Sequence, residues 1–182
     1  MAKPEARITL AVDVMGGDKG PSEVLSGIVK SSSFVPRDLK FLLFGPEKEI
    51  FGLLSENSEW QKIHHEVRHS PEVVAMDEKP IAGIKNKKKS SMALALNALK
   101  EKEADALLCC GNTGCLMAGG AIKLRTLEGV ERPALCTIWP GRERYFTLLD
   151  AGANPHPKPY HIVQNAILGS NYARVALGLV RP

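Results

Sequence analysis

Short apolar runs alternate along this chain with segments in which apolar residues recur every three or four positions. The runs predict strands over residues 8–14, 39–44, 106–109, 134–139 and 146–149, and a further extended segment is predicted over residues 62–67. The segments with helical spacing predict helices over residues 21–29, 47–54, 92–100, 116–127 and 160–177. Repeated strand–helix units with continuously apolar strands favour a mostly parallel sheet that helices cover on both faces. The predicted fold class is therefore α/β, in three α/β/α layers.

The last two strands are expected to pair differently. They are separated only by the polar turn Gly141-Arg142-Glu143-Arg144, which is typical of a hairpin. No repeat or low-complexity linker interrupts the pattern, and 182 residues suit one domain of ordinary size. We therefore expect residues 1–182 to form a single α/β domain.

Composition and charge narrow the possible partners. A net charge of +4 and only 5% aromatic residues do not provide the basic and aromatic surface of a nucleic-acid-binding protein. Asp13 interrupts the first apolar run before a signal-peptide core could form, and we expect a cytoplasmic protein. The cysteines lack a pair of metal-type spacings, so we expect reduced thiols and no metal. We also expect no cofactor. They are Cys109, Cys110, Cys115 and Cys136.

The turn Gly111-Asn112-Thr113-Gly114 follows a predicted strand and precedes a predicted helix. Glycines permit a close approach of the backbone to a ligand, Asn112 and Thr113 offer side-chain donors, and the free N–H groups of a helix start favour an anion. This turn is a candidate phosphate-binding site. A plain strand-to-helix turn, with Asn112 or Thr113 as the helix cap, accounts for the same residues.

A second candidate is the basic run that ends in Lys88-Lys89-Ser90-Ser91 at the start of a predicted helix. Either serine can cap the helix, and the ammonium groups, hydroxyls and free N–H groups could together hold a doubly charged oxyanion. The alternative is a solvated face of lysines.

Carboxylates at two further strand ends are also candidates. Asp13 precedes Gly16-Gly17-Asp18, and Asp150 precedes a small-residue turn that ends at Asn154. Such carboxylates can orient a lysine, bind a metal or act as a base, but in glycine turns they also hold the loop by accepting from backbone N–H groups.

One motif points elsewhere. His65-Glu66-Val67-Arg68-His69 satisfies the H-E-x-x-H pattern of zinc hydrolases, which requires a helix. The β-branched Val67 and the Ser70-Pro71 that follows favour an extended segment, in which the two histidines lie ~13 Å apart and cannot chelate one ion. We therefore do not expect a zinc site.

Five segments in this order resemble the bacterial phosphate acyltransferases of the PlsX family. They are AVDVMGGD (11–18), KKKSSM (87–92), GNTGCLMA (111–118), GVERPAL (129–135) and LDAGAN (149–154). The resemblance implies a fold similar to phosphotransacetylases and isocitrate-dehydrogenase-like enzymes. It implies an acyltransferase that converts acyl-(acyl carrier protein) and inorganic phosphate into acyl phosphate for phospholipid biosynthesis. A homodimer and a peripheral contact with membranes, through a part beyond this chain, are also implied.

The residue types agree with that reaction. Phosphate is itself the nucleophile, so the protein needs to hold two reactants and to stabilise an oxyanion. We assign a catalytic role to Lys88, Ser91, Asn112, Asp150, Asn154 and Lys158. Phosphate binding is assigned to Ser90, Ser91, Gly111, Asn112, Thr113 and Gly114. Orientation of the site is assigned to Asp13, Gly16, Gly17 and Asp18.

Two departures from the family pattern leave alternatives open. Pro155-His156-Pro157 stands where relatives usually have valine, aspartate and cysteine, so His156 puts the local chemistry in doubt. Family members are also considerably longer, so the resemblance covers about their N-terminal half, and we expect this chain alone to be inactive. The alternatives are a phosphotransacetylase-like enzyme that uses acyl-coenzyme A, and a non-catalytic piece that binds only phosphate or the carrier protein.

Overall fold

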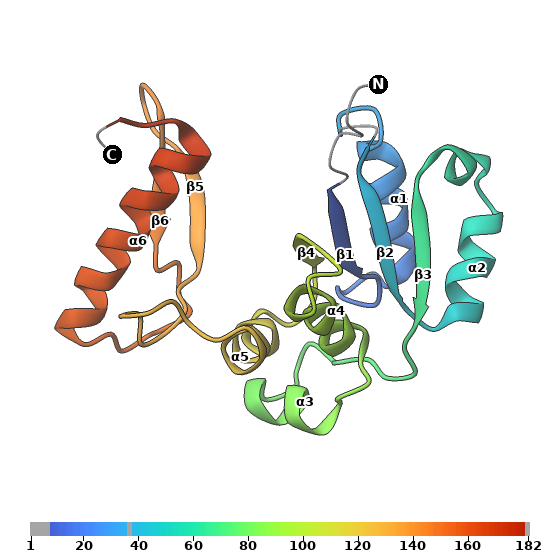
Figure 1. Cartoon of the computed structure of the whole chain (residues 1–182), viewed down its shortest axis with the longest axis horizontal. Helices are drawn as coiled ribbons and strands as arrows, with labels where there is room; N and C mark the ends of the chain where they lie inside the picture. The colour runs from blue at the N-terminus through green and yellow to red at the C-terminus, as the bar shows by residue number, and fades with distance from the viewer. Residues whose placement is uncertain (1–7, 36–37, 181–182) are drawn as a thin grey trace. The chain divides into compact units, whose positions relative to one another are not determined.

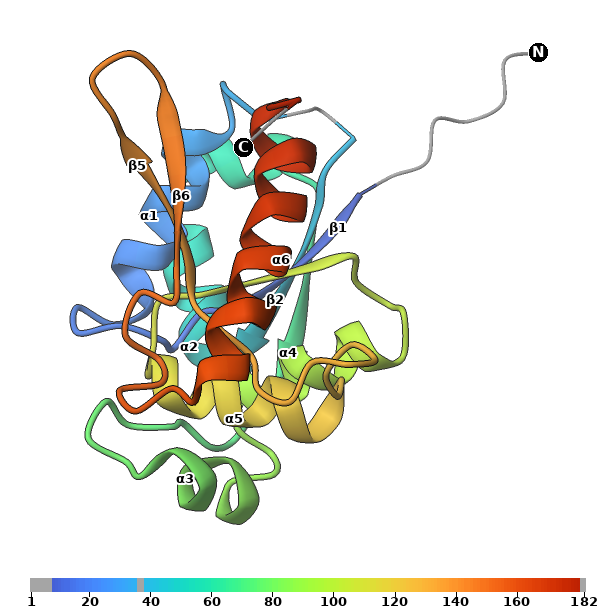
Figure 2. The same ribbon diagram turned by 90° about the vertical axis from the view of Figure 1, so that its left-hand side faces the viewer.

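The computed structural model describes residues 8–35 and 38–180. The chain divides into two compact units, Met1–Arg125 and Thr126–Pro182, and each is described here by itself. The single domain expected from the sequence stays a prediction. Figures 1 and 2 show the helices and strands of both units.

The first unit contains a four-stranded parallel sheet in the order β3-β2-β1-β4 (Figure 1). Its strands are β1 (Thr9–Asp13), β2 (Lys40–Gly45), β3 (His65–His69) and β4 (Ala106–Cys109). Its helices are α1 (Pro21–Ser31), α2 (Glu47–Ser55), the 3₁₀ turn η1 (Ser58–Lys62), α3 (Pro80–Asn86), α4 (Ser91–Lys100) and α5 (Thr113–Lys123).

Helices bury both faces of this sheet because side chains along a strand alternate between the faces. Val12 and Leu43 pack against α1 and α2 in one buried cluster. Their neighbours Ala11 and Leu42 pack against the alanines of α4 in a second cluster. This arrangement confirms the predicted α/β/α layers and the mostly parallel sheet.

The helices α3 and α5 form a further buried cluster with α4. Ile84, Met92, Leu96 and Cys115 belong to it, and each is at most 3% exposed. Gly119 of α5 lies so close to α4 that an added Cβ would stand 2.5 Å from Leu96 Cδ1. The glycine is therefore needed for the close packing of α5 on α4.

The second unit consists of an antiparallel hairpin and one long helix. Strands β5 (Cys136–Pro140) and β6 (Tyr145–Leu149) pair as predicted, and α6 (Pro159–Leu177) packs against β6. Pro159 occupies the first helical position, and Gly178 ends the helix in the left-handed conformation. Several large apolar side chains of this unit are exposed, among them Trp139, Phe146, Ile162, Val163 and Ile167.

Most element boundaries differ by one or more residues from the sequence prediction, and the largest differences have local causes. Helix α5 begins at Thr113 rather than residue 116, because Asn112 caps it, and it ends at Lys123, shortly before Arg125 adopts a φ of 68°. Strand β3 begins at His65 rather than residue 62, since η1 extends to Lys62. Helix α3 was not predicted from the sequence.

Two adjacent glycines of α5 provide a matched test of the packing. Gly120→Ala should raise the free energy of unfolding by about 0.5–1 kcal/mol, because its Cβ would meet nothing within 4 Å and alanine favours a helix. Gly119→Ala should lower it by ~1–3 kcal/mol, because the Cβ would overlap Leu96. Denaturant unfolding of both variants measures the difference, and equal gains would contradict the packing described.

Candidate functional site

The parallel pairing of β1 with β4 places Asp13 opposite Cys109 at the carboxyl ends of both strands. Cys109 Sγ donates to Asp13 Oδ2 over 3.0 Å. Burial, followed by the charge of Asp13, raises the pKa of the Cys109 thiol far above its ordinary value. Asp13 is 2% exposed, and its other oxygen, Oδ1, has no partner among the described residues. A buried carboxylate oxygen without a donor is costly, and it marks a place for a ligand or water.

The turns after these two strands touch at glycines. A Cβ on Gly16 would stand 2.8 Å from the backbone nitrogen of Gly111 and 2.9 Å from Asp13 Oδ2. Gly17 has a φ of 114°, which favours glycine. Asp13, Gly16, Gly17 and Gly111 therefore lie together at one edge of the sheet. Here the glycines permit the approach of protein backbone to protein backbone.

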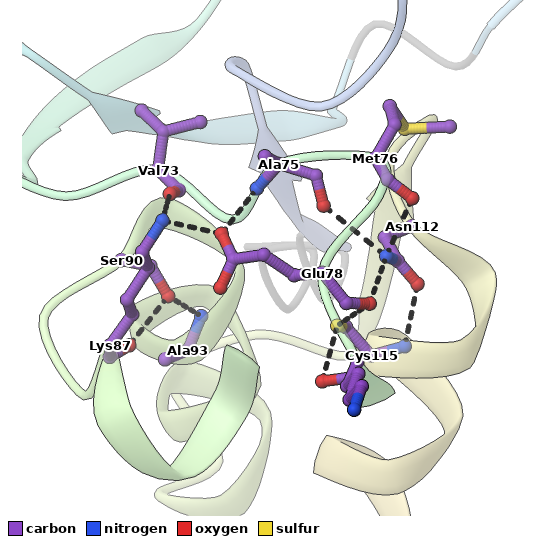
Figure 3. A network of polar contacts seen from close by, with 10 residues as sticks. Val73, Ala75, Met76, Glu78, Lys87, Ser90, Ala93, Asn112 and Cys115 are labelled. Carbon is purple, nitrogen blue, oxygen red and sulfur yellow. Dashed lines mark hydrogen bonds and ion pairs between the residues drawn. The ribbon is translucent and has the colours of Figure 1, made fainter. Parts of the chain in front are cut away.

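Asn112 connects the start of helix α5 to the loop that precedes helix α3 (Figure 3). Its Oδ1 accepts from the Cys115 backbone nitrogen over 2.9 Å, which caps the helix. Its Nδ2 donates to the carbonyl oxygens of Ala75, Met76 and Glu78 at 2.9–3.2 Å. Both N–H donors of the Asn112 amide are thus used by protein carbonyl oxygens, and the contact of Asn112 with phosphate stays a prediction.

The other two residues of this turn differ in their surroundings: Gly114 packs against α3, and Thr113 is exposed. A Cβ on Gly114 would stand 2.8 Å from Pro80 Cγ, so this glycine serves the contact between α5 and α3. Thr113 is exposed and begins the helix. The backbone N–H groups of Thr113 and Gly114 have no carbonyl to bond within the helix, and the macrodipole makes them favourable for an anion.

The two serines at the start of α4 differ sharply. Ser90 Oγ donates to the Lys87 carbonyl over 2.8 Å and accepts from the Ala93 backbone nitrogen over 3.3 Å, so Ser90 is the cap (Figure 3). Ser91 is 1% exposed, and its hydroxyl has no partner among the described residues. Of the two hydroxyls, that of Ser91 is thus the one without a described partner.

The lysines of the basic run also differ: Lys87 bonds to the protein, and Lys88 is exposed, a difference that the sequence did not indicate. Lys87 donates to the Val73 carbonyl over 2.7 Å and forms an ion pair with Glu78 (Figure 3). The hydrogen bond from Lys87, followed by that from the Ala75 backbone, lowers the pKa of the Glu78 carboxyl. Lys88 is exposed. Sequence reasoning missed Lys87 and Glu78 as the pair that fixes this loop.

In the second unit Asp150 organises its own turn. Its carboxylate accepts from the backbone nitrogens of Leu135, Ala153 and Asn154 and from Asn154 Nδ2 at 2.7–3.0 Å. Asn154 Nδ2 also donates to the Pro133 carbonyl over 3.0 Å. Burial raises the pKa of the Asp150 carboxyl, but these hydrogen bonds together outweigh it and hold the pKa below its ordinary value. The turn-holding role is the one this geometry supports.

Lys158 immediately precedes α6 in the same unit. Its backbone nitrogen donates to His161 Nδ1 over 3.0 Å, and its Nζ lies 5.7 Å from the centre of the Tyr160 ring. His161 is buried, and its Nε2 lies 3.3 Å from a carboxylate oxygen of Glu131. His156, the departure from the family pattern, is exposed.

The H-E-x-x-H segment is strand β3, in agreement with the extended conformation predicted for it. Glu66 forms ion pairs with Lys40 and Arg68 at 2.6 and 2.5 Å. In the part of the chain that the structure describes, no cluster of three or more His, Cys, Asp or Glu side chains could hold a metal ion. Over the same residues no helix is long and apolar enough to cross a membrane.

Comparison with known proteins identifies the family. The model of the fatty acid synthesis protein family matches residues 8–182. The chain belongs to this family. Similar curated proteins are the phosphate acyltransferases of Levilactobacillus brevis (38% identical, 95% of this chain, 50% of that protein), Ruegeria sp. (40%, 97%, 47%) and Roseobacter denitrificans (41%, 98%, 50%).

Membership in the family confirms the resemblance to phosphate acyltransferases inferred from the five segments. All five lie within the matched residues 8–182. The chain spans about half the length of the curated relatives that it matches. The roles assigned to individual site residues stay predictions, and the geometry above decides how each should be tested.

The turn around Asp150 makes stability depend on pH in a definite direction. Because the folded pKa lies below the unfolded value of about 3.9, the carboxylate stabilises the fold above that value, and the stabilisation is lost as the pH falls through the folded pKa. Asp150→Asn should lower the free energy of unfolding by ~1–3 kcal/mol at neutral pH and flatten its decrease below about pH 4. Denaturant unfolding at several pH values measures both effects.

Glu143→Gln is the control, since Glu143 is exposed in the hairpin turn of the same unit. It should leave the pH dependence unchanged. An Asp150→Asn variant that matched this control at every pH would show that Asp150 does not hold the turn.

Proposed function

We propose that the whole polypeptide that carries this sequence transfers an acyl group from acyl-(acyl carrier protein) to inorganic phosphate and releases acyl phosphate. The names of the relatives support phosphate as the acceptor. The observation that carries the proposal is a pair of buried polar atoms without a described partner, Asp13 Oδ1 and Ser91 Oγ. Asp13 is the last residue of β1, and the Ser91 backbone nitrogen donates to the carbonyl of Glu72, three residues beyond the end of β3. In open α/β sheets the carboxyl ends of the strands form the edge at which ligands bind.

The reaction needs few groups from the protein. An oxygen of hydrogen phosphate attacks the thioester carbonyl, the carbon–sulfur bond breaks, and the proton of the phosphate ends on the departing thiol. In this proposal Asp13 Oδ1 accepts a hydrogen bond from the phosphate hydroxyl, which positions the nucleophile. The Ser91 hydroxyl and the N–H groups of Thr113 and Gly114 donate to phosphate oxygens. Lys88 supplies a positive charge from the loop beside Ser91.

Asn112, Ser90, Asp150 and Asn154 have a different part in this proposal. Their polar atoms bond to the protein: Asn112 and Ser90 cap the helices whose starts present the donors, and Asp150 and Asn154 hold their own turn in the second unit. Each variant at these positions should therefore lower stability as well as turnover. Their roles as direct ligands, expected from the sequence, are the alternative that such variants would reveal.

We further propose, from the family resemblance, that the polypeptide is a cytoplasmic homodimer that touches membranes peripherally. The exposed apolar side chains of the second unit support an association of this kind, because extensive apolar surface marks interaction sites.

Ser90 and Ser91 provide the sharpest test of the proposed function. Ser91→Ala should lower kcat/KM for acyl phosphate formation by ~10²-fold without lowering the free energy of unfolding, because it removes a donor that none of the described residues uses. Ser90→Ala should lower the free energy of unfolding by about 1 kcal/mol, because it removes the helix cap. The assay measures acyl phosphate from acyl-(acyl carrier protein) and phosphate, and unfolding is followed in denaturant.

The same assay separates the alternatives. Activity confined to acyl-coenzyme A would favour a phosphotransacetylase-like enzyme, and the absence of turnover with either thioester would favour a non-catalytic protein that only binds phosphate or the carrier protein. A Ser91→Ala variant with the parent's turnover would remove Ser91 from the site. Lys88→Ala should lower turnover, whereas Lys85→Ala, in the last turn of α3, is its matched control.

A further inference from the structure

Helix α1 leaves a cavity on its side of the sheet in the first unit. The cavity has a volume of about 280 Å³ and runs along α1 over strands β1, β2 and β4. Leu108 of β4 is 40% exposed there, although it lies within a strand. The cavity is lined by, among others, Leu10, Val24, Gly27, Ile28, Leu108 and Cys110.

The lining is almost entirely apolar. Val24, Gly27 and Ile28 share one face of α1, as their helical spacing requires, and the strands contribute Leu10, Phe41 and Leu108. Glu23 and Ser31 provide polar side chains from α1, and among the described residues no lysine or arginine lines the cavity. An occupant of such a cavity is a neutral hydrocarbon chain, because nothing in the lining balances a negative charge.

One end of the cavity adjoins the carboxyl edge of the sheet. Cys110 lines it and lies between Cys109, which bonds to Asp13, and Gly111, which touches Gly16. A Cβ on Gly17 would stand 3.5 Å from Cys110 Cβ. The other end lies toward Leu39, which precedes β2, so the cavity extends from the candidate phosphate site toward the amino ends of the strands.

We propose that this cavity binds the acyl chain of the thioester substrate, and that the position of Gly27 sets the chain length accepted. This inference rests on the proposed function, which requires a reactive carbonyl at the carboxyl edge and room for a hydrocarbon beyond it. The Glu23 carboxylate at the first turn of α1 opposes a free fatty acid and favours a neutral thioester-linked chain. Gly27 lies about midway along α1, and a Cβ on it would meet nothing within 4 Å.

The test fills the cavity at Gly27. Gly27→Leu should lower kcat/KM for palmitoyl-(acyl carrier protein) by about tenfold or more while leaving that for the butyryl thioester within about twofold, because only the longer chain reaches the new side chain. Gly52→Leu is the matched control, since Gly52 lies in α2 and an added Cβ there also meets open space. It should leave the ratio of the two kcat/KM values unchanged.

The second measurement does not depend on turnover. An acyl-(acyl carrier protein) with a photoreactive diazirine at the end of its chain should label peptides of α1 and β4 in the whole polypeptide, and Gly27→Leu should abolish this labelling. An unchanged chain-length ratio in an active Gly27→Leu enzyme, or labelling confined to other segments, would overturn the acyl-chain site. Failure of the parent to form acyl phosphate would contradict the proposed function instead, and the labelling would still decide whether the cavity binds the chain.

Discussion

The contact between the turn after β1 and the turn after β4 determines what this edge of the sheet can do. The parallel pairing of the two strands sets Asp13 opposite Cys109, and the absence of side chains at Gly16 and Gly111 lets the two backbones meet. This contact between the turns buries the Asp13 carboxylate. Its Oδ2 accepts from the Cys109 thiol, and its Oδ1 has no donor among the described residues. A side chain at either glycine would separate the turns and open that carboxylate to water.

The polar residues around this contact serve two purposes. Ser90 caps α4 and Asn112 caps α5, and Asn112 also donates to the loop before α3. The side chains of both residues thus form hydrogen bonds with other parts of the protein. Asp13 Oδ1 and Ser91 Oγ are buried and unpartnered, which is costly unless a ligand or water completes them. Asn112 and Ser90 thus make the site rigid, whereas Asp13 and Ser91 offer the hydrogen-bonding atoms that we propose phosphate uses. Rigid turns with preorganised donors are what acyl transfer to phosphate requires.

Sequence periodicity predicted most of the elements, the parallel sheet and its α/β/α layers, because local spacing determines which faces are apolar. It could not predict the hydrogen bonds from Asn112 to the loop before α3, because the accepting carbonyl oxygens lie 34–37 residues earlier in the chain. Nor could it distinguish Lys87, which pairs with Glu78, from the similar lysines beside it. Helix α3 escaped prediction because seven residues with Gly83 inside give little helical signal.

Phosphate is proposed to bind at the carboxyl edge of the first unit's sheet. Amide chemical shifts of the whole polypeptide, followed by NMR during a titration with inorganic phosphate, reveal where phosphate binds. We expect saturable shifts at Gly16, Gly111, Thr113, Gly114 and Ser91, all of which a Ser91→Ala variant should weaken. Shifts confined to the exposed lysines, or to residues far from both glycine turns, would contradict it.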